Sequence, residues 1–382
     1  NKIITIRYDK KSYLLTGNDL KAYYNIAETV DEVQTKFENL WPWEKKSLIE
    51  NPKIKKVDLK VKYDKNVIEN VLNKMEGEIN RNPSDARIIM KNPGRLVVVD
   101  YVKGEKLNKN ATRFLIIKQI EADTINKIEI SPTIDITEPL ITEKQLKSVD
   151  SIISYASTVY RGSPEGRSKN IELAVAQING TLLMPGEIFS FNEVTGKRDE
   201  AAGYQNAPVI VKDNLEDGIG GGVCQVSSTL YNAVIRAGIS PLQRRNHTLA
   251  PAYVKPGLDA TVSDYIDFKF KNTLEYPIYI EGITSNGKVI FNLYSNASLK
   301  SIKYDIQCEI IETSKAVIKK LPDITLDEGK LVNEEPPHNG YKVNVFIITR
   351  KDGKEISREL LTRDSYKKVD GIIRVGKKKK QN

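Results

Sequence analysis

The sequence is poor in the residues that most often form disulfides and metal sites. Its 382 residues include two cysteines and two histidines. Cys224 follows a glycine-rich loop and Cys308 lies in an alternating strand pattern, so we expect neither a disulfide framework nor a zinc site. No apolar run approaches the roughly 18 residues that a membrane-spanning helix needs. Internal repeats and the signatures of zinc fingers and RNA-binding modules are also missing, and the composition is that of a globular protein.

Positive charge, in contrast, is present in excess. The formal net charge is +9, which predicts an anionic partner. Because no nucleic-acid signature accompanies the charge, we expect a polyanionic cell wall or membrane face rather than nucleic acid. The chain begins at Asn1 without a methionine, which is compatible with a trimmed export signal or membrane anchor.

The length predicts two or three domains, and the patterns indicate an α+β, multi-domain protein. We expect an α+β module at residues 1–147, a mixed α/β domain at residues 151–297 and a small β-rich module at residues 298–382. The first module shows no catalytic cluster and is interpreted as a binding or spacing domain. Within it, we expect Trp41-Pro42-Trp43 to be a packed loop rather than a ligand platform.

Hydrophobic periodicity locates the elements of these three parts. The first module is expected to contain a strand at 57–63, helices at 66–79 and 112–121, a hairpin at 86–99 around Pro93, and a closing pair of strands at 128–136. The middle domain is expected to contain a helix at Ser168–Ile178 capped by Ser168, and strands at 188–191, 209–211 and from 268 to 296. The last part is expected to contain strands at 302–311, 341–350, 355–361 and 372–375.

One stretch combines backbone freedom, a nucleophile and a helix. Four glycines, at positions 218, 220, 221 and 222, lead into Cys224, and apolar residues then recur at helical spacing up to Gly238. Cys224 is therefore expected in the first turn of an amphipathic helix, where free backbone N–H groups and the helix dipole favour the thiolate. The same N–H groups are suited to hold an oxyanion. The alternative is a small buried cysteine at a tight helix start.

The middle domain also holds one histidine, His247, just after this helix. A cysteine and a histidine are the minimal set for acyl transfer, because the imidazole exchanges the proton while the thiolate attacks a carbonyl. A third group usually orients the imidazole. We expect Asp259 in this role, since the glycine before the preceding leucine suggests a fixed loop geometry; Asp267 is the alternative and Asp264 a weaker one. A structural role for the histidine, and a turn or N-cap role for each aspartate, also agree with the sequence.

Substrate contacts are expected from the same stretch. Gly221, Gly222, Gln225 and Ser227 are placed next to the substrate, although helix capping is the other role open to Ser227. Four arginines are candidates for a bidentate pair with a substrate carboxylate: Arg167, Arg198, Arg244 and Arg245. We place Arg245 in this role, with an ordinary surface arginine as the alternative.

Four motifs together resemble the VanW domain. They are MPGEIFSFNEVTG, GYQNAPVI, GGGVCQVSSTLYNAVIRAG and DATVSDYIDFKFKN, all within residues 151–297. The first module resembles the peptidoglycan-binding domain that commonly precedes VanW domains in exported, membrane-anchored Gram-positive proteins. The last strands, with Gly353 and the closing Ile373-Arg374-Val375-Gly376, resemble a diverged glycine-rich wall-associated module.

The resemblance implies peptidoglycan L,D-transpeptidation, which some family members carry out with a cysteine at the position of Cys224. Family members also carry a histidine at the position of His247. Thr248 stands where serine is more usual, and Ser263–Ile266 departs from the common glycine-containing version, which puts a role for Asp264 in doubt.

We therefore expect an extracytoplasmic, cysteine-dependent L,D-transpeptidase of the cell wall or outer membrane face. It would form 3→3 cross-links between stem peptides, with L,D-carboxypeptidase as a side activity. Stem peptides and glycan strands are the expected partners of a monomer that needs no cofactor or metal, binds no nucleic acid and meets the membrane only through a trimmed anchor. The alternative is a non-enzymatic wall-binding protein associated with glycopeptide resistance. Because no chemistry is visible after Lys300, we expect residues 151–297 alone to act on small muropeptides.

Overall fold

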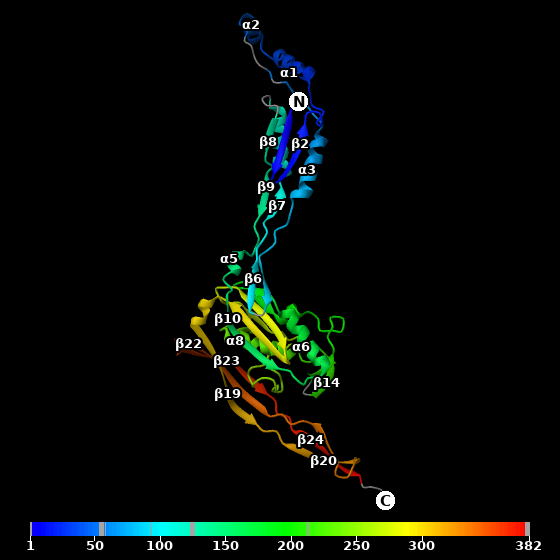
Figure 1. The fold of residues 1–382 in the computed structure, drawn as a ribbon, viewed down its shortest axis with the longest axis vertical. Coiled ribbons are helices and arrows are strands. Elements are labelled where there is room, and N and C mark those ends of the chain that lie inside the picture. The colour runs from blue at the N-terminus through cyan, green and yellow to red at the C-terminus, as the bar shows by residue number, and fades with distance from the viewer. Residues whose placement is uncertain are drawn as a thin grey trace. The chain divides into compact units, whose positions relative to one another are not determined.

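The computed structural model describes residues 2–52, 57, 59–92, 94–122, 127–211 and 214–378. The chain divides into two compact units: the N-terminal unit, Asn1–Ala86 with Asp100–Thr142, and the second unit, Arg87–Val99 with Glu143–Asn382. Both units mix helices and strands (Figure 1), which confirms the α+β, multi-domain class. The three boundaries given above, 1–147, 151–297 and 298–382, stay a prediction.

The N-terminal unit is built around helix α3 (Lys65–Ile79), whose side chains at three- and four-residue spacing form one buried face: Ile68, Leu72, Met75 and Ile79. This face shares a hydrophobic core with α4 (Lys109–Glu121) and with the sheet β2–β1–β8 (Lys11–Thr16, Ile3–Tyr8 and Lys127–Ile130). The other elements are β3 (Tyr23–Tyr24), α1 (Ile26–Glu38), α2 (Pro42–Glu50), β4 (Val61–Lys62), β7 (Gly104–Leu107) and β9 (Ile134–Thr137).

Most elements expected in this part of the chain are confirmed, and one pairing is wrong. The two helices are present, and so is the hairpin β5–β6 (Arg87–Asn92 and Arg95–Val99), although Pro93 lies outside the described residues and the hairpin belongs to the second unit. The strands near 128–136 do not pair with each other: β8 runs parallel to β1, and β9 is antiparallel to β7. The strand expected at 57–63 is limited to β4, and Asp58 lies outside the described residues.

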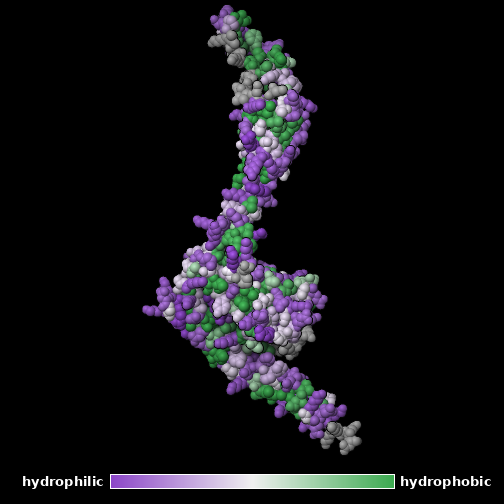
Figure 2. All heavy atoms as spheres, viewed as in Figure 1, coloured by the Kyte–Doolittle hydropathy of each residue, from purple (hydrophilic) through white to green (hydrophobic). Residues whose placement is uncertain are grey.

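The expectation of a packed loop at the two tryptophans is also wrong. Pro42 occupies the first position of α2, where proline is tolerated, so the segment continues as a helix instead of folding back. Trp41 and Trp43 stack on each other with ring centroids 5.0 Å apart and are 63% and 65% exposed. Figure 2 shows apolar residues at this end of the unit, where α1 and α2 also leave Ile26, Val30, Val33, Phe37 and Ile49 exposed.

Helix α8 (Val223–Arg236) lies at the centre of the second unit. All of its 14 residues except Cys224 and Arg236 are buried. The helix packs against α6 (Glu165–Ile178) and against a sheet in the order β10–β18–β17–β11 (Ser151–Val159, Lys288–Ser295, Ile278–Ser285 and Thr181–Leu183). Buried hydroxyls are tolerated in this helix because they are hydrogen-bonded; Thr229, for example, contacts Thr158 of β10 at 2.7 Å.

Shorter elements surround this core: α5 (Glu143–Leu146), β12 (Ile188–Ser190), α7 (Phe191–Thr195), β13 (Asn206–Val211), β14 (Asn214–Ile219), β15 (Pro241–Gln243) and β16 (Lys269–Lys271). Two details differ from the expectation. Helix α6 begins at Glu165, directly after Pro164, so Ser168 lies inside the helix and does not cap it. Phe191 begins α7 rather than ending the strand, because the Ser190 hydroxyl caps that short helix.

Residues 302–378, which we call the C-terminal module, follow a short helix η1 (Ala297–Ser301). They form two sheets, β19–β22–β23 (Ile302–Ser314, Gly340–Lys351 and Lys354–Tyr366) and β20–β24–β21 (Ile318–Asp327, Gly371–Lys378 and Leu331–Glu335). Strands β20 and β21 were missed because nearly all of their side chains are exposed and show no alternation. Val343 and Val345 of β22 belong to the same hydrophobic core as α8, so this module and the preceding residues of the second unit are packed together.

Candidate active site

The loop before α8 requires glycine at consecutive positions. Gly220 and Gly222 have φ angles of +84° and +103°, which side chains strongly disfavour. A Cβ atom on Gly221 would lie 2.6 Å from the carbonyl oxygen of Pro208 and 2.8 Å from that of Ala207. The loop therefore passes close to β13 and delivers Cys224 to the first turn of α8, as the sequence predicts.

Fewer backbone N–H groups at the start of α8 are free to bind a ligand than the sequence predicts. The N–H of Val223 donates to the carbonyl oxygen of Gly220 at 3.2 Å, and the N–H of Gln225 donates to that of Gly222 at 3.0 Å. These two groups are used to close the turn. The anion-binding capacity of the helix start thus rests on fewer N–H groups than the sequence alone indicates.

Cys224 lies at the wall of a cavity of about 640 Å³. Its thiol is half-buried and lies against the backbone of Val262, 3.4 Å from the carbonyl oxygen and 3.5 Å from the nitrogen. The glycine loop forms part of the lining, together with two other segments that contain His247 and Asp264. The thiol is therefore neither sealed in the core nor fully exposed.

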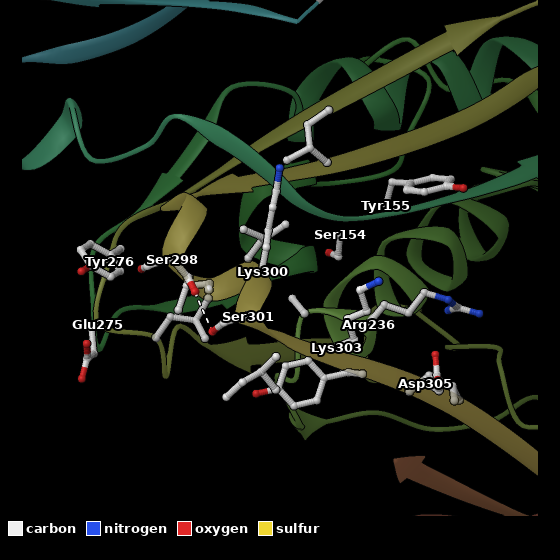
Figure 3. Close-up of a pocket in the computed structure, with 18 residues that line it drawn as sticks. Ser154, Tyr155, Arg236, Glu275, Tyr276, Ser298, Lys300, Ser301, Lys303 and Asp305 are labelled. Carbon is white, nitrogen blue, oxygen red and sulfur yellow. Dashed lines mark hydrogen bonds between the residues drawn. The ribbon is translucent and has the colours of Figure 1, made fainter. Parts of the chain in front are cut away.

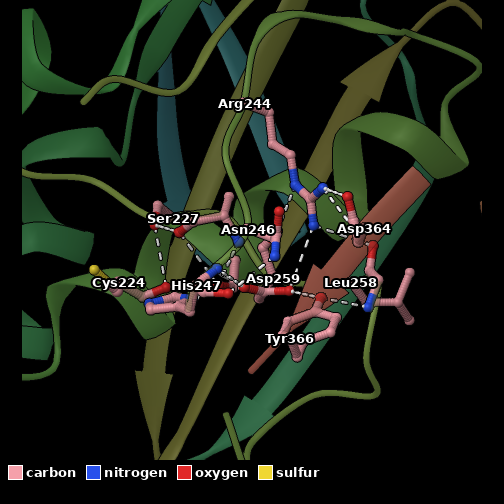
Figure 4. Close-up of polar contacts among 12 residues, drawn as sticks. Cys224, Ser227, Arg244, Asn246, His247, Leu258, Asp259, Asp364 and Tyr366 are labelled. Carbon is pink, nitrogen blue, oxygen red and sulfur yellow. Dashed lines mark hydrogen bonds and ion pairs between the residues drawn. The ribbon is translucent and has the colours of Figure 1, made fainter. Parts of the chain in front are cut away.

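His247 and Asp259 form a close pair beside this thiol (Figure 4). The ring Nδ1 of His247 lies 2.6 Å from Asp259 Oδ2, and the backbone N–H of His247 donates to the same oxygen at 2.7 Å. The carboxylate is fully buried and the imidazole is 10% exposed. Since Nδ1 is engaged by the carboxylate, Nε2 is the ring nitrogen left available to Cys224, which lines the same cavity.

The pKa values of Cys224 and His247 are shifted in opposite directions. Burial alone would raise the pKa of the Cys224 thiol, but the hydrogen bond and charge of His247, with a smaller contribution from Arg198, lower it below its usual range. Burial alone would lower the pKa of His247, but its hydrogen bonds to Asp259 and Cys224 raise it to about 10. This combination favours a thiolate–imidazolium pair near neutral pH.

Three residues behind Asp259 were not predicted in these positions. The hydroxyl of Tyr366 donates to Asp259 Oδ1 at 2.5 Å, and Arg244 donates through Nε to the Asp259 carbonyl oxygen at 2.6 Å. Arg244 in turn bonds both oxygens of Asp364, at 2.6 and 2.7 Å. Asp364 and Tyr366 are buried on one face of β23, which extends past the strand expected at 355–361. No pattern in the sequence predicts this cluster.

The other predicted residues divide into two groups. Gly221, Gly222 and Gln225 line the cavity, and the side chain of Gln225 is fixed there by Arg167 Nη2, which donates to its Oε1 at 2.7 Å. Ser227 is buried and does not line the cavity. Its hydroxyl donates to the backbone carbonyl oxygens of Ala260 and Cys224 instead.

Arg245 and Asp267 lie away from the thiol. The side chain of Arg245 is exposed and is not part of the cavity lining. Asp267 accepts hydrogen bonds from the Ser190 hydroxyl at 2.6 Å and from the N–H of Asn192 at 3.0 Å. Of the two candidate carboxylates, Asp259 is thus the one that contacts His247.

The arginines that do line the cavity are Arg167 and Arg198. Arg198 is 10% exposed, and its Nη1 is buried without a hydrogen-bond partner among the described residues. A buried guanidinium nitrogen without a partner is costly. It therefore marks a place where an anionic ligand group would gain a hydrogen bond.

A larger cavity of about 850 Å³ lies elsewhere in the second unit, between β10, the end of α8 and the start of β19 (Figure 3). Its charged lining residues are Arg236, Glu275, Lys300, Lys303 and Asp305. Neither cysteine nor histidine is among the residues that line it. We therefore place the chemistry in the smaller cavity at Cys224.

Comparison with known families identifies three parts of the chain. Residues 166–294 match the family described as VanW like protein, the segment that holds Cys224, His247 and Asp259. The chain contains a VanW-like domain. Residues 13–129 match the Putative peptidoglycan binding domain, and residues 309–378 match the G5 domain. The VanW-like domain thus lies between two other recognised domains, and the G5 match includes Asp364 and Tyr366.

Two curated relatives share the VanW-like part. The chain is 47% identical over 145 residues to the Uncharacterized protein YoaR of Bacillus subtilis, covering 38% of this chain and 48% of that protein. It is 28% identical over 139 residues to the Vancomycin B-type resistance protein VanW of Enterococcus faecalis, covering 35% and 50%. The chain therefore spans about half the length of these relatives.

Two solved structures resemble part of the chain. The IgA1 protease G5 domain has a TM-score of 0.16 and 20% identity, covering 20% of this chain and 93% of that one. HP0197-G5 has a TM-score of 0.14 and 21% identity, covering 20% and 97%.

Among the described residues, no helix combines the length and apolar character needed to cross a membrane. These residues also contain no group of three or more histidine, cysteine, aspartate or glutamate side chains arranged to hold a metal ion.

Proposed function

We propose that the VanW-like domain is a cysteine-dependent L,D-transpeptidase of peptidoglycan. In this proposal Cys224 is the nucleophile, His247 exchanges the proton and Asp259 orients His247. The observation that carries the proposal is the run of contacts from Cys224 through His247 to Asp259 at the wall of the cavity.

The first half of the reaction forms an acyl-enzyme. The Cys224 thiolate attacks the carbonyl carbon that follows the diamino acid of a tetrapeptide stem, and a C–S bond forms. The imidazolium of His247 then gives its proton to the departing amine as the C–N bond breaks. D-Alanine leaves, and the rest of the stem stays on Cys224 as a thioester.

The second half transfers the acyl group. The side-chain amine of a second stem attacks the thioester carbonyl, and neutral His247 takes a proton from that amine. The C–S bond breaks, the thiolate and the imidazolium are restored, and a 3→3 cross-link has formed. If water attacks instead, the product is a shortened stem and the activity is that of an L,D-carboxypeptidase.

The charge of the cavity supports a substrate with a carboxylate. Arg198 has a buried Nη1 without a partner among the described residues, and Arg167 lies on the same lining. Guanidinium groups pair well with carboxylates. We assign Arg198, rather than Arg245, to bind a carboxylate of the stem peptide.

The two flanking matches support action at the cell wall. A peptidoglycan-binding domain and a G5 domain on one chain agree with binding of cell-wall polymers and with an extracellular or cell-wall location. The N-terminal unit would hold the glycan strand and raise the local concentration of stems at the cavity. The net charge of +9 suits a wall rich in phosphate and carboxylate.

The second candidate is a wall-binding protein without catalysis, and one experiment separates the two. Purified protein is incubated with disaccharide-tetrapeptide, and the products and the Cys224 peptide are analysed by mass spectrometry. We expect cross-linked dimers, free D-alanine and an acylated Cys224. Binding to isolated wall with no dimer and no acyl adduct would favour the non-enzymatic candidate.

The two cysteines provide matched variants for this experiment. Cys224→Ala should abolish both products while the chain stays folded, because a small residue fits the helix start. Cys308→Ala should keep the activity, since Cys308 lies in β19 and burial raises its pKa. Its cost should be limited to roughly 1 kcal/mol of stability. Reversed phenotypes would show that the nucleophile is misassigned.

A further inference from the structure

The end of β23 lies along the segment that carries His247. Asn246 Nδ2 donates to the carbonyl oxygen of Ser365 at 2.9 Å. On the other side of the histidine, the backbone N–H of Lys367 donates to the carbonyl oxygen of Thr248 at 2.8 Å. The C-terminal module therefore contacts the residues on both sides of His247, the side chain of Asn246 before it and the backbone of Thr248 after it.

Between these two contacts, Tyr366 reaches the carboxylate that orients His247. Its hydroxyl donates to Asp259 Oδ1 at 2.5 Å and accepts the N–H of Gly257 at 2.7 Å. The imidazole binds the other oxygen, Oδ2. The two oxygens are thus held from opposite sides, which fixes the rotation of the carboxylate. Without the hydroxyl, the one remaining side-chain donor to Oδ1 among the described residues would be Arg244 Nη2, at 3.4 Å.

A second link runs from the module to the backbone of Asp259. Asp364 holds Arg244 through two short hydrogen bonds, and Arg244 donates to the carbonyl oxygens of Asp259 at 2.6 Å and Gly257 at 3.3 Å. The side chains of this ion pair are each 3% exposed. Because a buried ion pair loses stability when one partner is removed, Asp364 restricts where Arg244, and therefore the Asp259 backbone, can lie.

We infer that Tyr366 and Asp364 are positioning residues of the catalytic site, and that the C-terminal module is part of the catalytic machinery. The inference rests on the function proposed above for Cys224, His247 and Asp259. Neither residue lines the cavity, so both act through Asp259. The expectation that residues 151–297 suffice for activity is replaced, because that segment lacks the hydroxyl and the carboxylate that fix Asp259.

The consequence is a shift in the thiolate titration. The charged and titratable groups around the Cys224–His247 pair are Arg167, Arg198, Tyr253 and Asp264 at the cavity and Asp259, Arg244, Asp364, Tyr366 and Tyr231 behind it. Of these, Asp259 is the anion that bonds the imidazole. When Asp259 is held less well, the imidazolium is less stabilised, and the thiol loses its proton only at higher pH.

The test measures this titration directly in the full chain. The rate of alkylation of Cys224 by iodoacetamide is followed from pH 4 to 10 by mass spectrometry of the Cys224 peptide. Tyr366→Phe should raise the midpoint by up to about one pH unit, because a carboxylate that is free to rotate stabilises the imidazolium less than one held against Nδ1. Tyr341→Phe is the matched control: Tyr341 is the cross-strand partner of Tyr366, but its hydroxyl lies at an exposed contact with Asn339. Its midpoint should equal that of the wild type.

Each outcome decides the inference. A folded Tyr366→Phe with the wild-type midpoint would overturn it. A wild-type midpoint no lower than that of an ordinary thiol would instead count against the proposed function, because alkylation needs no cross-linking activity. If Tyr366→Phe does not fold, Asp364→Asn should raise the midpoint through Arg244, and an unchanged midpoint there would contradict the inference. If both variants unfold while Tyr341→Phe folds, the two residues are structural only, and the inference is wrong.

Discussion

The backbone N–H and the ring Nδ1 of His247 both bond the same carboxylate oxygen of Asp259, at 2.7 and 2.6 Å. A single hydrogen bond would let the ring turn about the bond axis. The second bond anchors the histidine backbone to the same atom, so the ring plane and the tautomer are both determined. Nε2 is left for Cys224, which is the arrangement that a thiol acyl transferase requires.

The first prediction concerns this carboxylate. Asp259→Asn should lower the rate of dimer formation on the order of 1000-fold, because an amide neither stabilises the imidazolium nor enforces the tautomer. The initial rate with disaccharide-tetrapeptide is the measurement. Asp267→Asn is the control: Asp267 holds Ser190 and Asn192 instead, so the rate per folded molecule should stay near that of the wild type. Equal losses in the two variants would contradict the assignment of Asp259.

The second prediction concerns stability as a function of pH. Between pH 6.5 and 9, the ordinary pKa values of histidine and cysteine, the unfolded pair holds its proton on the thiol. Above the lowered pKa of Cys224, the folded pair holds one proton too, on His247, so the two states bind equal numbers of protons. The wild-type pair should therefore add no pH dependence to the free energy of unfolding in this window.

Cys224→Ala should remove that balance. Folded His247, still paired with Asp259, then keeps a pKa above its unfolded value and binds more protons than unfolded His247. The stability it contributes is fully present below pH 6.5 and is lost as pH rises, at up to about 1.4 kcal/mol per pH unit. Thermal unfolding of both chains from pH 6 to 9 measures the difference. Parallel curves would mean that His247 is not charged in the folded protein.

The site was predictable from the sequence where the signal is local. Cys224 stands out because glycines with positive φ and a helical pattern flank it within one stretch. Asp259 was preferred over Asp267 as the residue that orients His247 because a glycine, Gly257, lies just before it. The φ angle of Gly257 is +94°. That loop approaches β22 so closely that a Cβ atom on Gly257 would lie 2.6 Å from Val345. The loop before Asp259 thus has the restricted geometry that the sequence suggests, and the catalytic role of Asp259 stays a prediction.

The rest was not predictable because it depends on contacts over long separations in sequence. Tyr366 and Asp259 are 107 residues apart, and the order of the strands that brings them together is not visible in hydrophobic periodicity. Arg245 and Arg198 have the same chemistry in the sequence, and only the folded chain shows that one is exposed and the other is at the cavity. Free N–H groups were overestimated because Gly220 and Gly222 close a turn onto α8.

The third prediction uses this difference between the arginines. Arg198→Gln should raise the KM for a tetrapeptide stem on the order of 10- to 100-fold, because a charge-assisted hydrogen bond to a substrate carboxylate is lost. Arg245→Gln removes the same charge from an exposed side chain and should leave KM near the wild-type value. Steady-state kinetics of the two variants decide between them. A larger increase of KM in Arg245→Gln would show that Arg245 binds the substrate carboxylate, as expected from the sequence.

The last prediction concerns the loop that places the thiol. Gly221→Ala puts a Cβ atom 2.6 Å from the Pro208 carbonyl oxygen, and this backbone atom cannot move aside as a flexible side chain would. The loop and the start of α8 must shift, so the rate should fall by roughly 100-fold, and stability by roughly 1–3 kcal/mol.

Gly77→Ala is the matched control, because Gly77 lies on an exposed face of α3 with nothing within 4 Å of the added atom. That variant should gain up to about 1 kcal/mol from helix propensity and keep full activity. Cross-linking rate and thermal unfolding of the two variants test the prediction, and a Gly221→Ala chain with the wild-type rate would mean that the position of Cys224 does not depend on this close approach.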